Sequence, residues 1–261
     1  MSWGFVVAGA AVVPLLVWLL KKADAPVSVV GAVGLVVGGL VVVAWRWGSG
    51  AWAPWWWPVP WLLTVVGGPL SLADVRHRRL PDVLTLPAYP AMAAAVALGA
   101  LTGGGPAILT DAAAGALVFG GAHLAVHRAL PGRMGAGDVK LAGVLGAVLG
   151  VLGWASTAFA AVAAAAMSAA LGVRLQAAAR TPRTAGLGGV ARLSAIVESE
   201  APAWSSAPDA PPKPAGPSTP NRPLTPARRP LHHGVPHGPA LLLATWICAV
   251  FPGAASGVAP S

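Results

Sequence analysis

The residues best suited to chemistry are two aspartates, each at the end of an apolar run. Asp138 lies in the sequence Gly135-Ala136-Gly137-Asp138-Val139-Lys140, and Asp74 precedes Val75 and Arg76 in a basic segment. Charged groups are costly inside a bilayer, so acids at such positions indicate function. Two carboxyl groups that share about one proton can hydrolyse an amide, because the ionised group takes a proton from water while the protonated group polarises the carbonyl.

The neighbours of Asp138 suit that chemistry. Gly135 and Gly137 allow the backbone to bend and let a substrate chain approach closely. Lys140 is expected to help keep a carboxylate ionised, to bind a carbonyl oxygen, or to extend its ammonium group to the membrane surface as an anchor, and the sequence leaves these roles open. Asp82 follows Pro81 and is predicted to begin a helix, with a role as a third catalytic acid as the less favoured alternative.

The composition predicts the elements that must hold these acids: an all-α, polytopic helical membrane protein. Of the 261 residues, 56% are hydrophobic and only 10% are charged. Several apolar runs are long enough to cross a hydrocarbon layer, where helices satisfy all the backbone polar groups. About eight transmembrane helices are expected, over residues 4–20, 28–45, 59–73, 83–101, 107–126, 139–152, 154–173 and 238–255.

The basic residues indicate the orientation of these helices. The formal net charge is +9, and most Lys and Arg occur in loops that would share one membrane face, which the positive-inside rule assigns to the cytoplasm. Those residues are Lys21, Lys22, Arg76, Arg78, Arg79, Arg128, Arg133 and the residues from Arg174 onward, whereas the other loops hold only Arg46. We therefore expect a multi-pass protein of the plasma membrane, with no nucleic-acid partner and with both aspartates at the cytoplasmic face.

The chain divides into four segments. Residues 1–58 are predicted to form an N-terminal two-span membrane region, and residues 59–173 hold both aspartate motifs. Residues 174–237 are expected to be a disordered cytoplasmic insertion with a short helix over residues 187–196, because twelve of the 26 prolines lie between Pro202 and Pro239. Residues 238–261 are expected to form the last transmembrane helix and a tail.

No metal ion or cofactor is expected. The chain has one cysteine, so a Cys-x-x-Cys zinc site cannot form. His123 and His127 are one helical turn apart, but the glutamate of a His-Glu-x-x-His motif and a third ligand are missing, so packing or hydrogen bonds to nearby carbonyls are the expected use. His232, His233 and His237 border the insertion and are expected in a solvated loop.

Three segments resemble the signature regions of the prepilin peptidases, the type IV leader peptidases of the GxGD class. They are Asp74-Val75-Arg76 with Leu80-Pro81-Asp82-Val83-Leu84-Thr85-Leu86-Pro87, then Gly135-Ala136-Gly137-Asp138-Val139-Lys140-Leu141, and more weakly Gly234-Val235-Pro236-His237-Gly238-Pro239-Ala240-Leu241. The resemblance covers about residues 59–255, apart from the insertion. It implies that Asp74 and Asp138 are the catalytic pair of a metal-independent aspartic endopeptidase, which cuts the basic leader of prepilin-like proteins just before their hydrophobic N-terminal helix.

The sequence departs from the bifunctional members of that family. Those members carry a cytoplasmic domain with paired Cys-x-x-Cys motifs and methylate the new N-terminus. Here only residues 21–27 separate the first two predicted spans, and the paired cysteines are absent. The resemblance therefore implies cleavage without methylation. The expected partners are a prepilin-like substrate and the lipid bilayer, while the oligomeric state and the choice among pilus, competence and secretion systems stay open.

Other interpretations also stay open. A catalytically silent relative would keep the fold and serve pilus or secretion assembly. A proton-coupled transporter would also place acids beside glycine breaks, but near the bilayer midplane and with inverted repeats, which the sequence does not show. Presenilin-like proteases share the Gly-x-Gly-Asp motif, but their first aspartate lies well inside a helix, usually beside a tyrosine. Here Asp74 lies near arginines, and Tyr89 is the one tyrosine.

Overall fold

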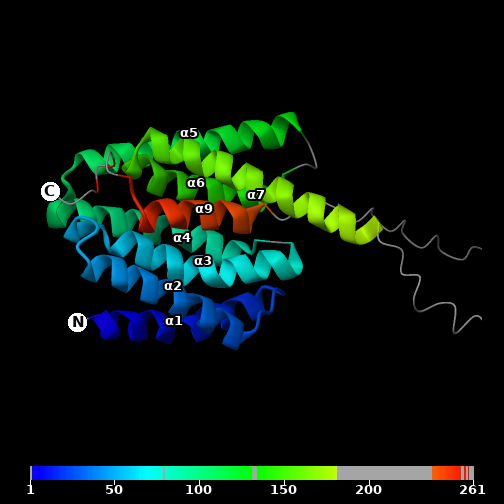
Figure 1. Cartoon of the computed structure of the whole chain (residues 1–261), viewed down its shortest axis with the longest axis horizontal. Helices are drawn as coiled ribbons and strands as arrows, with labels where there is room; N and C mark the ends of the chain where they lie inside the picture. The colour runs from blue at the N-terminus through cyan, green and yellow to red at the C-terminus, as the bar shows by residue number, and fades with distance from the viewer. Residues whose placement is uncertain are drawn as a thin grey trace, which may run out of the picture. The chain divides into compact units, whose positions relative to one another are not determined.

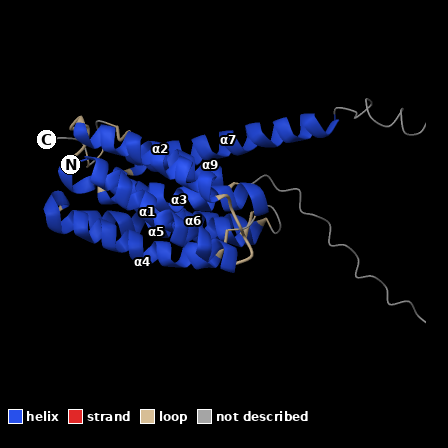
Figure 2. Ribbon diagram, turned by 90° about the horizontal axis from the view of Figure 1, so that it is seen from below, coloured by secondary structure: helices blue, strands red, loops and turns tan. Residues whose placement is uncertain are grey.

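The structure, a computed structural model, describes residues 2–78, 80–130, 134–180, 237–253, 256 and 258. The chain divides into two compact units, one formed by Met1–Gly172 with Gly234–Ser261 and the other by Val173–His233. The described residues form helices and loops, and they contain no strand (Figure 2). The prediction of an all-α membrane protein is confirmed.

Eight α-helices occur in the described part of the chain, and they match the predicted spans in order and number (Figure 1). They are α1 (Ser2–Lys22), α2 (Val29–Gly48), α3 (Pro58–His77), α4 (Asp82–Gly99), α5 (Ala107–Ala129), α6 (Ala136–Leu152), α7 (Trp154–Arg180) and α9 (Gly238–Val250). Two short segments, η1 (Pro54–Trp56) and η2 (Ala100–Gly104), lie between α2 and α3 and between α4 and α5.

Six of these helices, α1 to α5 and α7, are long and apolar enough to cross a membrane. The other two are shorter, with 17 residues in α6 and 13 in α9. A full span needs about 20 residues, so these two helices are too short to cross an unperturbed hydrocarbon layer alone. The protein is thus a multi-pass membrane protein in which six of the eight expected helices have the length of a span.

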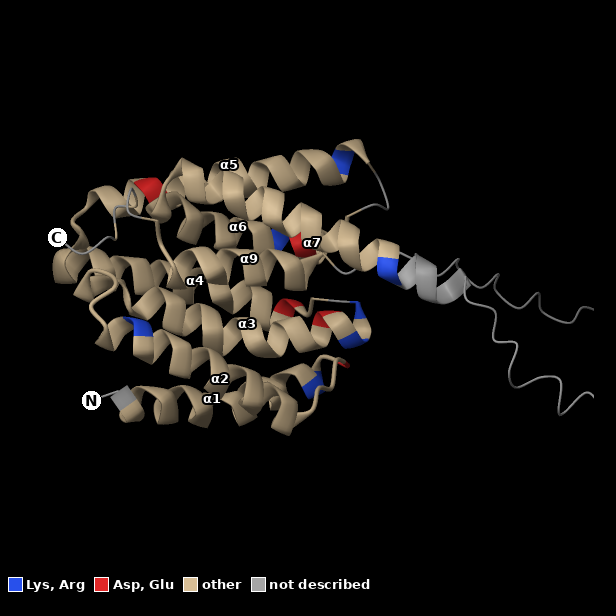
Figure 3. Cartoon of the chain, viewed as in Figure 1, with Lys and Arg blue, Asp and Glu red and all other residues tan. Residues whose placement is uncertain are grey.

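Successive helices run in opposite directions (Figure 1). The C-terminal ends of α1, α3 and α5 therefore lie beside the N-terminal ends of α2, α4, α6 and α9. We call this end of the bundle the basic end because it holds Lys21, Lys22, Arg76, Arg78 and Arg128, whereas Arg46 lies at the other end (Figure 3). This separation of charge is the one that the predicted topology requires.

Glycine contacts hold α6 against α5. A Cβ atom at Gly115 of α5 would overlap the carbonyl oxygen of Gly146, and one at Gly150 would overlap that of Asp111. Small residues at such positions let two membrane helices approach closely enough for extensive van der Waals contact. This packing fixes the axis of the helix that carries Asp138.

The helix α9 packs between α3 and α6, in contact with both. At its C-terminal end, Trp56 Nε1 donates a hydrogen bond to the Ala249 carbonyl over 2.9 Å, and Arg46 Nε donates to the Val250 carbonyl over 3.1 Å. These bonds satisfy carbonyl groups that have no partner within the helix. With that end held, the N-terminus of α9 lies at the basic end, between the helices that carry the two acids.

Two boundaries differ from the prediction. The helix α7 continues to Arg180, because residues 174–180 are good helix formers and no proline occurs before Pro182. The helix α9 ends at Val250 rather than near residue 255, since Pro252 follows closely. The rest of the predicted insertion, residues 181–236 with the short helix at 187–196, lies outside the described residues.

Candidate active site

Asp74 lies in the last turn of α3, which ends where Arg78 takes a left-handed conformation with φ of 51°. The Arg78 N–H donates to the Asp74 carbonyl oxygen over 2.7 Å. This conformation costs about 1–2 kcal/mol for a residue other than glycine, and such strain is concentrated at functional sites. The Asp74 side chain is 5% exposed, and its Oδ2 has no hydrogen-bond partner among the described residues.

Asp138 lies in the first turn of α6 and is half-buried. Gly135 precedes the helix in an extended conformation, and its carbonyl accepts a hydrogen bond from the Asp138 N–H over 3.1 Å. The side chain turns back over this glycine, so that a Cβ atom at residue 135 would lie 3.4 Å from Asp138 Oδ2. The unpaired N–H groups of a helix N-terminus stabilise negative charge, which makes this a favourable place for a carboxylate.

The two acids meet at Gly238, the first residue of α9. A Cβ atom at this position would lie 2.8 Å from Asp74 Oδ2 and 3.3 Å from Asp138 Oδ1. These two oxygens are therefore no more than about 6 Å apart, a separation at which the charge of one carboxyl group affects the other. The structure thus brings the two predicted acids together, and it adds a backbone segment that touches both.

The loop between α3 and α4 covers this pair with Leu80. A Cβ atom at Gly137 would lie 2.8 Å from Leu80 Cβ, and one at Gly238 would lie 3.3 Å from Leu80 Cδ1. Any larger residue at position 137 would push Leu80 away from the acids. The second glycine of the motif therefore has a packing role, in addition to the flexibility that the sequence suggested.

Lys140 makes an ion pair with Asp82, the first residue of α4, rather than with either acid of the pair. Its Nζ lies 2.7 and 2.8 Å from the two carboxylate oxygens. The Tyr89 hydroxyl, also on α4, donates to the Lys140 carbonyl. Both contacts join α4 to the first half of α6. This ion pair is a role for Lys140 that differs from those that the sequence left open.

Lys140→Met should lower the activity of the site less than about threefold and thermal stability only slightly. The two side chains are 39% and 56% exposed, and exposed ion pairs contribute less than about 1 kcal/mol. Asp82→Asn is the matched change on the other partner and should behave in the same way. Loss of activity in Lys140→Met but not in Asp82→Asn would show that the ammonium group acts on Asp74 and Asp138 instead.

His237 is half-buried beside the pair, which corrects its prediction as part of a solvated loop. Its Nδ1 is hydrogen-bonded to Ser168 Oγ over 2.6 Å, and its ring centroid lies 6.3 Å from that of His123. The residue is drawn inward because Gly238 follows it directly and packs against both acids. His123 itself donates from Nδ1 to the Phe119 carbonyl over 2.8 Å, the kind of bond that the sequence predicted.

The contribution of His237 to protein stability should fall as the pH drops below about 6.5, and His237→Gln should remove that contribution. Burial lowers the pKa of His237 from 6.5, with Asp138 opposing the shift and His123 adding to it. The His237 side chain therefore binds a proton more readily in the unfolded chain than in the folded one. Its contribution to the free energy of unfolding is fully present above pH 6.5 and is lost on acidification. Melting temperatures between about pH 5 and pH 8 test this. An unchanged slope in the variant would contradict it.

Sequence reasoning found the two acids but missed their neighbours. Gly238 and His237 lay within the third segment that resembles the prepilin peptidases, so a signal existed, although neither residue was assigned to the site. Ser168 stands in an Ala-rich helix and carried no signal. No group of three His, Cys, Asp or Glu side chains within the described ranges has the arrangement of a metal site.

Comparison with known proteins gives one match. No curated protein and no solved structure matches the chain. The family model described as the type IV leader peptidase family matches residues 59–173, the segment that contains Asp74, Leu80, Gly137 and Asp138. The match and the geometry around Gly238 lead to the same conclusion: residues 59–173 are a segment of the type IV leader peptidase family.

Proposed function

We propose that the protein is an aspartic endopeptidase that removes the short basic leader of prepilin-like proteins, with Asp74 and Asp138 as the catalytic pair. The observation that carries this proposal is the approach of both carboxyl groups to Gly238. The two acids lie on separate helices, and separate packing contacts bring each of them close to Gly238. An arrangement of this kind serves a reaction that needs two carboxyl groups at once.

The chemistry follows from the different surroundings of the two acids. Asp138, at a helix N-terminus, is suited to be the ionised member that takes a proton from water. Asp74, buried with one oxygen unpaired, is suited to be the protonated member that donates a hydrogen bond to the scissile carbonyl. Attack of the water oxygen on the carbonyl carbon gives a tetrahedral intermediate. Transfer of a proton to the amide nitrogen then breaks the carbon–nitrogen bond and releases the leader.

The position of the pair supports cleavage at the cytoplasmic face of the plasma membrane. Asp74 is in the last turn of α3 and Asp138 in the first turn of α6, at the basic end of the bundle. The positive-inside rule assigns a basic end to the cytoplasm. A carrier would hold its acids near the middle of the membrane, so the same position argues against a proton-coupled transporter.

The first two helices support cleavage without methylation. Helix α1 ends at Lys22 and α2 begins at Val29, so the connecting loop is too short to hold a further domain. The chain also has a single cysteine, which is buried in α9 at position 248 and cannot form paired Cys-x-x-Cys motifs.

The direct test is to incubate the purified protein, in lipid nanodiscs, with a membrane-inserted prepilin-like substrate and S-adenosylmethionine. Mass spectrometry of the product should show one cut at the end of the leader and an unmodified new N-terminus. A methylated product would overturn the second part of the proposal. Absence of cleavage across a panel of leaders would favour a catalytically silent relative.

A further inference from the structure

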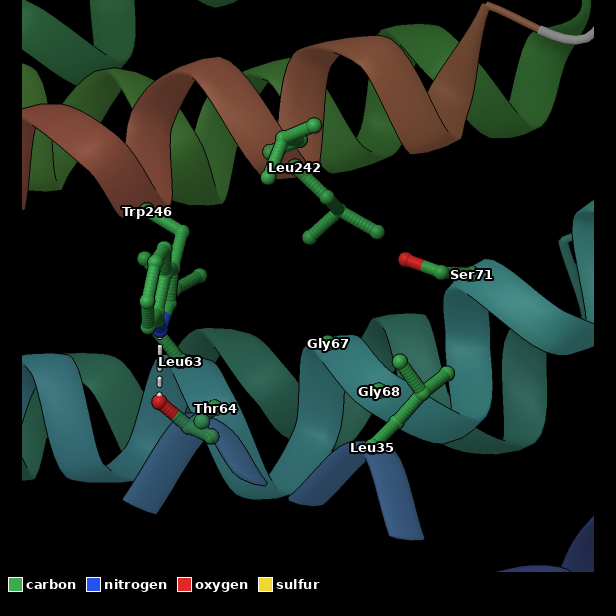
Figure 4. Close-up of a pocket in the computed structure, with 10 residues that line it drawn as sticks. Leu35, Leu63, Thr64, Gly67, Gly68, Ser71, Leu242 and Trp246 are labelled. Atoms are coloured by element: carbon green, nitrogen blue, oxygen red, sulfur yellow. Dashed lines mark hydrogen bonds between the residues drawn. The ribbon is translucent and has the colours of Figure 1, made fainter. Parts of the chain in front are cut away.

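A continuous seam between α3 and α9 starts at the two acids and runs toward the opposite end of the bundle. At its start, Gly238 packs against Asp74. One turn further along α9, Leu242 lies next to Gly67, where a Cβ atom would be 3.4 Å from Leu242 Cδ2. Another turn along, Trp246 Nε1 donates to Thr64 Oγ1 over 2.8 Å (Figure 4). The contacting residues on α9 are spaced by four, so they lie on one face of the helix.

A cavity of about 240 Å³ lies along this seam, on the side of α2. Its lining is almost entirely apolar, and Ser71 is the one hydroxyl at the end nearest to Asp74 (Figure 4). The lining residues are Leu35 and Gly39 of α2, then Leu63, Thr64, Gly67, Gly68 and Ser71 of α3, and Leu242, Leu243 and Trp246 of α9. We call this cavity the α2–α3–α9 groove.

The groove is open to the outer surface of the bundle, at the level of the membrane-spanning segments. Leu35 is 51% exposed and Leu243 is 47% exposed, so the rim faces the surroundings of the protein. Both α2 and α3 have the length and hydropathy of a membrane span. An occupant therefore reaches the groove from the hydrocarbon layer and has to be apolar. The cavity is smaller than the roughly 300–1,000 Å³ of small-molecule sites, so it suits side chains rather than a cofactor.

The distance from the acids identifies which part of a substrate reaches the groove. Ser71 precedes Asp74 by three residues, a rise of about 4–5 Å along the helix. An extended chain covers that distance in one or two residues. A substrate whose scissile bond lies between the two acids thus places the adjoining residues at the mouth of the groove. Its leader must stay in water at the basic end, so the residues that enter are those that follow the bond.

We propose that the α2–α3–α9 groove binds the first apolar residues after the scissile bond and so aligns the substrate's membrane-spanning segment along the enzyme. This inference rests on the proposed peptidase function and adds the site that selects membrane-inserted substrates. Ser71 contacts the chain nearest the cut, and the rim residues Leu35 and Leu243 contact the following turn. Specificity for a chain with an apolar segment then arises from the groove, and cleavage arises from the acids.

The test compares two substrates: the membrane-inserted protein, and a short soluble peptide that spans the scissile bond but lacks the apolar segment. Leu35→Trp and Leu243→Trp narrow the part of the groove that lies away from the acids. In both variants the ratio of kcat/KM for the membrane substrate to kcat/KM for the peptide should fall about tenfold, a change typical of an altered apolar contact in a binding pocket. The effect should appear mainly as a higher KM for the membrane substrate.

Val41→Trp is the matched control, since Val41 is 43% exposed on the same helix but does not line the groove. It should keep the wild-type ratio. If both groove variants keep the wild-type ratio of the two kcat/KM values, the inference is overturned and the peptidase function is left intact. The same holds if the ratio falls equally in Val41→Trp. Failure of the wild-type protein to cleave either substrate would instead overturn the function itself. Cleavage of the peptide also shows that a groove variant has folded.

A second measurement detects the occupant directly. A photo-crosslinking amino acid at Leu243, in the Asp138→Asn background, should capture the apolar segment of the membrane substrate. The same probe at Leu101, which is 86% exposed in η2, should not. A lipid adduct at Leu243 that persists when substrate is in excess would overturn the inference, because the groove would then be an acyl-chain site.

Discussion

Asparagine at Asp74 or at Asp138 is expected to abolish leader cleavage, with a fall of at least about 10³-fold in kcat for each change. Asparagine keeps the shape of the side chain but cannot exchange the proton that the mechanism requires. The two acids act as a unit, so the double variant should be no less active than either single variant. Cleavage is followed as the mobility shift of a co-expressed substrate, and kcat is measured with purified protein.

Asp111→Asn is the matched control for these variants. Asp111 lies in the first half of α5, at the end of the bundle away from the catalytic pair, and should keep wild-type activity. Each variant must accumulate in the membrane at the wild-type level for the comparison to hold. More than about a tenth of wild-type cleavage in Asp74→Asn or Asp138→Asn would break the assignment of a two-acid mechanism, since one carboxyl group would then suffice.

The two acids of the proposed catalytic pair could be picked out in the sequence because charge is rare in this chain. Only 10% of the residues are charged, so an acid at the end of an apolar run stands out against its surroundings. The helices could be predicted for the related reason that apolar runs of the right length have few alternatives in a membrane. The start of α4 at Asp82 followed from a proline before an acid, and the structure has it there.

The features that surround the pair could not be predicted in the same way. Gly238 is one of 33 glycines, and its importance arises only because α9 inserts between α3 and α6. The groove brings together residues such as Thr64 and Trp246, which are 182 positions apart in the sequence, so no local sequence pattern indicates the groove. His237 was misplaced because its neighbours in sequence are polar and proline-rich, whereas its position is decided by the docking of the helix that follows.

The lengths of α6 and α9 have a consequence for the mechanism. Both α6 and α9 have their N-termini beside the two acids. Both are too short to span a hydrocarbon layer, although both are well buried among longer helices. Neighbouring helices supply the contacts that lipid would otherwise make, so the N-termini of α6 and α9 can be held at a depth set by packing. The glycine contacts with α5 hold α6 in place, and the hydrogen bonds from Trp56 and Arg46 hold α9 in place. The spacing of the two carboxyl groups therefore depends on contacts far from them.

Gly238→Ala should lower kcat about 10²-fold while leaving KM within about threefold and the fold intact. The new methyl group would lie 2.8 Å from Asp74 Oδ2 and 3.3 Å from Asp138 Oδ1, where it contacts both carboxyl groups at once. Contacts under 3.0 Å force a shift, and displacement of a catalytic group by about 1 Å can cost 10²-fold in rate. Binding of the substrate's apolar segment is unaffected, so the loss should fall on kcat.

Gly121→Ala provides the control for a change from glycine to alanine inside a helix. A Cβ atom at Gly121 of α5 would meet nothing within 4 Å, and alanine favours the helix by up to about 1 kcal/mol, so activity should be unchanged and the melting temperature equal or higher. Wild-type kcat in Gly238→Ala would show that the carboxyl groups can rearrange around α9 without loss. The catalytic geometry would then be set when substrate binds, and the approach of both acids to Gly238 would no longer support their assignment as a preformed pair.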